Sequence, residues 1–368
     1  MKVSPIVAAA LFAASLPAYA QLSVVDSNYS VTPYYADPLA NNITGFDWDG
    51  TGALDYMTTD SSGYESFTGV YSFSGGPTGV NTTIDGGIYP SENFVGNSVV
   101  ALGNYVYYNY SDYSENEYIN QFDPTIGSAS VGVSSTAENW GLYKNNGQLF
   151  ITGAGSDYIN HIFVSTPGSN GNLTTVTDLG ATGDSSGPLA FDSAGDLFYA
   201  PGYGNPNIYK WTALQVAAAE ANPTVDSLTE TSGTNGSALL WVSYGSNPAY
   251  SAYASYGGAT SMLVESDGDV LVTLNATEWY PYPPGGSTVY PSDLVDFSDN
   301  GSTATTILTD TSALMGDIAQ QSGTTYVADG SQIDTLQVVP EPSAMMLLAL
   351  GGLGAGVIFL RRKSKALA

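Results

Sequence analysis

An acidic loop near the N-terminal end of the chain has the residue types and spacing of a calcium-binding site. Counted from Asp47, carboxylates stand at positions 1, 3 and 9 (Asp47, Asp49, Asp55), a hydroxyl at position 5 (Thr51) and a glycine at position 6 (Gly52). Calcium takes six to eight oxygen ligands, and the glycine lets the loop turn back on the ion. The spacing therefore favours a calcium-binding loop over residues 47–55. The alternative is an acidic hairpin turn, because Asp-Gly is a favoured turn pair.

Two groups of aromatic residues are candidates for sugar binding, because exposed rings stack on sugar faces. Trp279, Tyr280 and Tyr282 lie in a loop rich in proline and glycine, where a binding role and a packing role are equally supported. The second group, residues 105–110, alternates tyrosine along a strand-like run and is better explained by packing between strands.

Other catalytic chemistry has little support. The chain has no cysteine and a single histidine, His161, which excludes thiol chemistry and a multi-histidine metal centre. Four further acids, Asp192, Asp196, Asp267 and Asp269, stand in predicted hairpin turns, where turn formation explains them better than cation binding. We therefore predict no catalytic residue, and calcium as the one candidate cofactor.

The charge of the chain excludes two classes of partner. Of 34 acidic residues only Glu341 lies outside residues 21–337, whose bases are Lys144 and Lys210, so this segment carries a formal net charge of −31 (2 − 33). Such a surface repels nucleic acid and anionic lipid. It attracts divalent cations, and it also favours solubility in an extracellular setting.

The N-terminus has the pattern of a secretory signal peptide, residues 1–20. Lys2 supplies the positive charge, an alanine-rich apolar run follows, and Ala18 and Ala20 form a small-x-small cleavage site before Gln21. We therefore expect an exported domain, residues 21–337.

The C-terminus, residues 338–365, has three parts in order. The sequence Val339, Pro340, Glu341, Pro342 and Ser343 comes first. Residues 344–360 carry no charge and predict a single transmembrane helix, about 26 Å long. Arg361, Arg362 and Lys363 open a basic run, residues 361–365, that predicts a cytoplasmic stop. The two prolines keep the region around Glu341 extended and accessible to a processing enzyme.

This tail resembles a PEP-CTERM sorting signal, found on exported proteins of Gram-negative bacteria that make exopolysaccharide. The resemblance implies transient anchoring in the inner membrane, recognition by the transpeptidase exosortase at or near residues 340–342, and transfer to the cell surface or extracellular matrix. It covers about 28 of the 368 residues and implies nothing about the rest of the chain.

The exported domain reads as all-β, with a recurring unit of an apolar strand, a polar turn and a second strand. Turns of this kind are centred near Thr51, Gly103, Asn146, Gly195, Asp267 and Gly323, 43 to 72 residues apart. That period predicts a β-propeller. The longest interval holds a helix-like run, residues 212–222, and a candidate degenerate blade, residues 237–244. We therefore expect six or seven blades, with a pair of β-sandwiches as the rival architecture.

These hairpins resemble, loosely, those of NHL-repeat and gluconolactonase-like propellers. The loop from Asp47 to Asp55 resembles the calcium loop of FG-GAP blades, whose position 5 is usually Asp or Asn. That resemblance implies Asp47, Asp49, Thr51 and Asp55 as the calcium ligands, with Thr51 as a departure.

We expect a surface or matrix protein that binds polysaccharide, calcium or both, without catalysis. The alternatives are a calcium-dependent propeller hydrolase or lyase and, because threonines occur only in scattered pairs, least of all an ice-binding protein. Carboxylates converging on a cation in the axial channel would favour the enzyme. Acids on outer turns with aromatics at one rim would favour binding.

Overall fold

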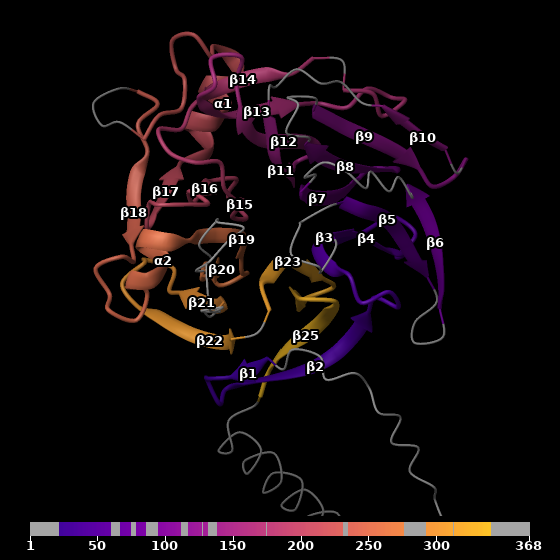
Figure 1. Cartoon of the computed structure of the whole chain (residues 1–368). Helices are drawn as coiled ribbons and strands as arrows, with labels where there is room; N and C mark the ends of the chain where they lie inside the picture. The colour runs from indigo at the N-terminus through magenta and orange to yellow at the C-terminus, as the bar shows by residue number, and fades with distance from the viewer. Residues whose placement is uncertain are drawn as a thin grey trace, which may run out of the picture.

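The computed structural model describes residues 22–59, 67–74, 79–85, 95–111, 117–126, 128–131, 138–173, 175–230, 235–275, 292–311 and 313–339. Within these ranges the chain forms six antiparallel sheets arranged as blades around an axis, together with two short helices (Figure 1). The innermost strands of neighbouring blades contact one another in a closed ring. The protein is therefore a six-bladed β-propeller.

The blades follow one another along the chain, each running from its innermost strand outward. Blade 1 contains β3 (Asn42–Trp48), β4 (Leu54–Thr59), β5 (Phe67–Ser74) and β6 (Val80–Asp85); blade 2 contains β7 (Val95–Leu102), β8 (Tyr105–Ser111), β9 (Glu117–Asp123) and β10 (Ser128–Val131); blade 3 contains β11 (Glu138–Asn145), β12 (Gln148–Ala154), β13 (Asn160–Ser165) and β14 (Thr177–Ala181). Blade 4 contains β15 (Leu189–Phe191), β16 (Leu197–Tyr199), β17 (Asn207–Trp211) and β18 (Leu239–Ser243); blade 5 contains β19 (Gly258–Val264), β20 (Val270–Asn275), β21 (Ser292–Phe297) and β22 (Ala304–Asp310); blade 6 contains β23 (Met315–Gln321), β24 (Thr324–Asp329) and β25 (Gln332–Val338).

The first strands of the chain close the ring. β2 (Tyr29–Ala36) pairs with β25 from Tyr29 opposite Val338 to Ala36 opposite Gln332, and so supplies the outermost strand of blade 6 (Figure 1). β1 (Ser23–Val24) pairs with β22 and extends blade 5. The strands that close the ring all lie within residues 22–339, and we call this range the propeller body.

All six predicted turns join the first and second strands of a blade, which confirms the repeat read from the sequence. Each turn is compact because a residue with positive φ lets the chain reverse, as Gly103 (φ 65°) and Gly323 (φ 78°) do. The rival pair of sandwiches is wrong, since the innermost strands form a single ring.

The long interval of the repeat holds an insertion instead of a seventh blade. Helix α1 (Ala213–Ala221) follows β17 and begins with a capping box between Thr212 and Gln215. The candidate degenerate blade, residues 237–244, contains β18, the outermost strand of blade 4. A second helix, α2 (Ser251–Tyr256), leads into blade 5.

The hydrophobic core lies between the blades. Alternate residues of a strand point to opposite faces of its sheet, so each blade contributes to two clusters. Val327 of β24 packs with Leu271 of blade 5, whereas the next residue, Ala328, packs with Phe46 and Tyr56 of blade 1. Because both faces are covered by neighbours, each blade depends on the next for its burial.

Candidate functional site

The predicted calcium loop is the turn between β3 and β4. The carboxylate of Asp49 closes this turn: its Oδ1 accepts from the Thr51 N–H (2.8 Å), the Thr51 hydroxyl (2.7 Å) and the Ala53 N–H (2.9 Å). Gly52 adopts a positive φ of 84°. Asp49 and Thr51 therefore already bond to one another within the hairpin turn.

Asp47 and Asp55 face each other across the same hairpin. They are paired in the register of β3 and β4, which places both side chains on one face of the sheet. That face points to blade 2, because Asp47 Oδ2 accepts from the N–H of Ala101 on β7 (2.8 Å) and pairs with the ammonium of Lys144 on β11. Burial, and then the charges of Asp49 and Asp47, raise the pKa of Asp55 to about 8.

The structure thus brings Asp47 and Asp55 together and leaves Asp49 and Thr51 at the turn. In the described part of the chain, no group of three or more His, Asp or Glu side chains is arranged to hold a metal ion. A calcium ion at this loop would have to bind the carboxylate oxygens that take no part in these hydrogen bonds. Calcium binding at this loop therefore stays a prediction.

The other acidic turns bind protein groups. Asp192 Oδ1 accepts from the N–H groups of Ala194 and Asp196 (both 2.9 Å), which is turn formation as expected. The second oxygens of Asp192 and Asp196 lie 3.2 and 3.0 Å from the ammonium of Lys210. The cation between these two aspartates is therefore a lysine of the same blade.

Carboxylates at the axis tie innermost strands together. Asp317 of β23 accepts from the Ser261 hydroxyl on β19 (2.7 Å) and from the Phe46 N–H on β3 (3.1 Å). Burial raises its pKa to about 6. Asp47 bonds β7 and β11 in the same way. These axial acids act as links between blades.

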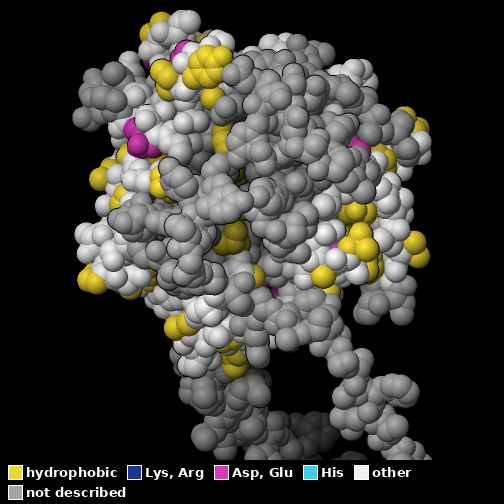
Figure 2. All heavy atoms as spheres, in the orientation of Figure 1, with side chains coloured by type: hydrophobic (Ala, Val, Ile, Leu, Met, Phe, Trp, Pro, Cys, Tyr) yellow, Lys and Arg dark blue, Asp and Glu magenta, His cyan; other side chains and the backbone are white. Residues whose placement is uncertain are grey.

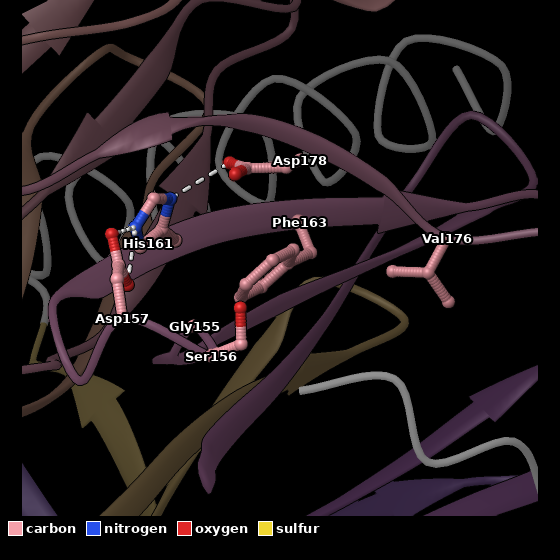
Figure 3. A pocket seen from close by; sticks show the side chains of 7 residues that line it. All are labelled: Gly155, Ser156, Asp157, His161, Phe163, Val176 and Asp178. Carbon is pink, nitrogen blue, oxygen red and sulfur yellow. Dashed lines mark hydrogen bonds and ion pairs between the residues drawn. The ribbon is translucent and has the colours of Figure 1, made fainter. Parts of the chain in front are cut away.

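The pocket drawn in Figure 3 lies on blade 3, where the loop between β12 and β13 meets β14. It has a volume of about 300 Å³ and is lined by Gly155, Ser156, Asp157, His161, Phe163, Val176 and Asp178. The single histidine of the chain stands in its wall.

His161 is held between two aspartates (Figure 3). Its Nδ1 lies 2.9 Å from Asp178 Oδ1, and its Nε2 lies 3.3 and 3.4 Å from the two oxygens of Asp157. Both carboxylates are half-exposed, whereas the imidazole is largely buried. Since both ring nitrogens face carboxylates, the arrangement is suited to binding polar groups and cations more than to proton abstraction by the imidazole.

The sequence did not reveal this site. In the sequence, His161 is a lone histidine with no catalytic partner beside it. Asp157, four residues earlier in a polar loop, was a weak local signal. Asp178 was invisible, since only the pairing of β13 with β14, with a register shift between Ile162 and Phe163, brings it to the histidine.

A rim of polar and aromatic residues continues from this pocket to blade 4. The Asn160 amide donates to the Asp184 carbonyl (2.7 Å) and accepts from the Ser186 hydroxyl (2.6 Å). The Ser185 hydroxyl in turn accepts from the Tyr203 N–H (2.7 Å). In every blade the connection between the second and third strands lies at the same end of the propeller. Tyr158 and Tyr203 each stand in such a connection, so both lie at that end.

Both tyrosines of this rim are open to solvent: Tyr158 is 66% exposed and Tyr203 47% exposed. Tyr158 holds a left-handed backbone conformation (φ 62°), which costs about 1–3 kcal/mol in a residue other than glycine. By contrast, Tyr107 and Tyr108 of the second aromatic group are fully buried, as the packing interpretation expects.

The predicted tail begins where the described residues end. The Val339 N–H donates to the Asn28 carbonyl (2.6 Å), so the chain leaves the propeller beside β2. No helix among the described residues is long and apolar enough to cross a membrane. Several predicted residues lie outside the described residues: Ala18, Ala20, Trp279, Tyr280, Tyr282, Pro340, Glu341, Pro342, Ser343, residues 344–360, Arg361, Arg362 and Lys363.

The tail itself matches a known family. Residues 338–363 match the family model of the PEP-CTERM protein-sorting motif. The chain ends in a PEP-CTERM motif. This confirms the tail assigned from the sequence. The motif implies export and membrane-anchored sorting in a Gram-negative bacterium, with processing by exosortase.

The propeller body is similar in fold to several solved structures. A protein of Carbohydrate-Active Enzymes family AA12 from Trichoderma reesei is 12% identical, with a TM-score of 0.55, covering 88% of this chain and 98% of that one. A gluconolactonase from Xanthomonas campestris is 13% identical (TM-score 0.50; 87% and 98% covered). A calcium-binding regucalcin from Agrobacterium tumefaciens is 11% identical (TM-score 0.51; 87% and 94% covered). At these identities the likeness concerns the fold alone, and it agrees with the gluconolactonase-like propeller expected. No curated protein sequence matches the chain.

Proposed function

We propose that this chain is a surface or extracellular-matrix protein whose propeller body binds polysaccharide without altering it chemically. The observation that carries the proposal is the rim between blades 3 and 4. There Tyr158 and Tyr203 are exposed at one end of the propeller, and Tyr158 directly follows Asp157, whose half-exposed carboxylate faces His161 together with that of Asp178. Rings offer faces for sugar stacking, and carboxylates accept bonds from sugar hydroxyls.

The axial acids support binding over catalysis. Asp317 and Asp47 each bond to the innermost strands of neighbouring blades. A hydrolase or lyase needs carboxylates that are free to transfer protons or to hold a cation against substrate. Acids used as links between blades are less available for that work, so we place the alternative of a calcium-dependent enzyme second.

Two further elements belong to the proposal. Trp279, Tyr280 and Tyr282 lie between β20 and β21, whose adjoining ends, Asn275 and Ser292, belong to the same end of the propeller as Tyr158. We propose that they add to the sugar-binding surface. Calcium at the loop from Asp47 to Asp55 is the candidate cofactor.

Replacing both exposed rim tyrosines is expected to weaken polysaccharide binding. With the purified propeller body on an array of bacterial glycans, Tyr158→Ala together with Tyr203→Ala should lower binding at least tenfold, because each lost stacking contact contributes about 1 kcal/mol. The buried Tyr107→Phe is the matched control and should bind as the unchanged protein does. The absence of any glycan ligand would refute the proposal, and release of shortened glycan would establish the enzyme instead.

Deleting Pro340 to Ser343 is expected to stop processing of the tail. An exosortase needs the extended peptide, so the altered chain should stay in the membrane fraction at its full length. The measurement is immunoblotting of membrane, surface and medium fractions. A deletion of residues 366–368, behind the basic run, is the control. Normal release of the chain without residues 340–343 would contradict processing at this motif.

A further inference from the structure

The pocket on blade 3 carries more negative charge than its histidine balances. Two half-exposed carboxylates, Asp157 and Asp178, face one imidazole. The ring is close to Asp178 (2.9 Å), but its contact with Asp157 is long, at 3.3 and 3.4 Å. Asp157 also accepts from the Ile159 N–H (3.1 Å), a bond that holds the pKa of its carboxyl below its usual value. Asp157 is therefore an ionised acceptor with capacity left for a ligand.

We propose that this pocket binds one sugar ring that bears a free amino group, within or at the end of a polysaccharide. The inference rests on the proposed function and names the class of sugar that the rim selects. An ammonium group at Asp157 would make charge-assisted hydrogen bonds, which are stronger than those of a neutral hydroxyl. Hydroxyls of the same ring would bond to Asp178 and Ser156.

The size and walls of the pocket fit such a ring. A volume of about 300 Å³ lies at the lower end of the range for small-ligand pockets, enough for one hexose unit. Phe163 and Val176 form an apolar side, and Phe163 stacks on His161 at 5.6 Å between ring centroids. A sugar has both an apolar face and polar edges, and this pocket offers a surface for each (Figure 3).

Gly155 keeps the pocket open. A Cβ at this position would lie 2.8 Å from Asp157 Oδ1 and 3.2 and 3.3 Å from two atoms of the His161 ring. A larger residue would therefore force the carboxylate or the imidazole away from the position that the proposed sugar would meet. The exposed ring of Tyr158 lies three residues along the same loop, where the next unit of a polymer would meet it.

The charge of the surroundings also selects against acidic sugars. The two bases of residues 21–337, Lys144 and Lys210, are both paired with aspartates, and no Lys or Arg colour appears among the coloured side chains in Figure 2. The exported domain as a whole carries a formal net charge of −31. Uronic acids would meet repulsion both on approach and within the pocket, whereas an ammonium would be attracted.

The test compares two short ligands of the same length by calorimetry on the propeller body at pH 6 and 0.15 M salt. One is a glucosamine trimer with free amino groups, and the other is the same trimer fully N-acetylated. We expect the free amine to bind at least tenfold more tightly, and Asp157→Asn to remove that preference by weakening binding of the free amine more than binding of the acetylated trimer. Gly155→Ala should weaken both ligands.

Asp299→Asn is the matched control, because it removes one charge from an exposed turn between β21 and β22, at the opposite end of the propeller. It should keep the preference for the amine. Equal binding of both trimers would overturn the inference and leave polysaccharide binding standing. Equal loss of the preference in Asp157→Asn and Asp299→Asn would overturn it as well, since general attraction would then explain the effect. Binding of neither trimer would overturn the amine site, and the glycan array then decides the proposed function separately.

Discussion

Tyr35→Ala is expected to destabilise the propeller body by about 3–5 kcal/mol, as loss of a large buried aromatic side chain does. Tyr35 lies on β2, the strand that closes the ring, and it is buried. Its hydroxyl bonds to the Tyr56 hydroxyl (2.6 Å) and to the Asn81 amide (2.7 Å), both on blade 1. Its ring lies 4.6 Å from that of Phe73 on the same blade. The side chain therefore joins the closing strand to blade 1 as well as to blade 6.

Two neighbouring variants separate the contributions. Tyr35→Phe keeps the ring and loses the hydroxyl, which should cost about 1–3 kcal/mol, because the buried Tyr56 hydroxyl loses a partner. Tyr34→Ala changes the next residue of the same strand, which is exposed and should cost about 1 kcal/mol or less. Urea unfolding followed by tryptophan fluorescence measures all three. Similar losses of stability for Tyr34→Ala and Tyr35→Ala would show that closure of the ring does not depend on the contacts of Tyr35 with blade 1.

The architecture was predictable from the sequence because blades are local. Each pair of inner strands is joined by a short turn of Gly, Asn, Asp or Ser, so the six turns near Thr51 to Gly323 are visible without any knowledge of distant contacts. Closure was not predictable. The pairing of β2 with β25 joins residues about 300 positions apart, and nothing local in Tyr29–Ala36 marks it as the partner of the last strand.

The sites divide in the same way. The turn role of Asp192 and Asp196 follows from residue type, whereas their shared partner Lys210 comes from the third strand of the blade. Asp47 reads in sequence as a calcium ligand, but its bonds to Ala101 and Lys144 come from blades 2 and 3. What a carboxylate bonds to is set by blade packing, and the spacing of acids along the chain does not contain that information.

The same packing leaves two carboxyl groups buried with raised pKa values, and this sets the pH dependence of stability. Asp55 and Asp329 are each 1% exposed. Burial first, and then neighbouring carboxylates, raise the pKa of Asp55 to about 8 and that of Asp329 to about 9. In the unfolded chain such groups titrate near pH 3.9. Between these values the folded state holds protons that the unfolded state releases, so stability is highest in acid and falls as the pH rises toward 8–9.

We therefore expect the melting temperature of the propeller body to fall by roughly 10 °C between pH 5 and pH 8, since each group contributes at most about 1.4 kcal/mol per pH unit. Asp55→Asn and Asp329→Asn, both neutral and similar in shape, should each reduce the slope, and the double variant should reduce it most above pH 7. Below that pH, Glu230 and Glu265, whose pKa values burial raises to about 7, keep a smaller slope. Asp299→Asn removes an exposed charge and should leave the slope nearly unchanged. If the three single variants have the same slope, general repulsion among the acids is the cause, and the buried groups are not.

The same melting experiment can be repeated with added calcium. A calcium ion at the loop from Asp47 to Asp55 would have to displace the proton of Asp55. Binding would then strengthen with pH, and added calcium should restore the melting temperature at pH 8 while having little effect at pH 5. Asp55→Asn should remove that response, whereas Asp329→Asn, between blades 5 and 6, should keep it. If added calcium leaves the melting temperature at pH 8 unchanged, the loop binds no calcium and is a hairpin turn held by Asp49 and by the ion pair between Asp47 and Lys144. Protonation alone would then neutralise Asp55.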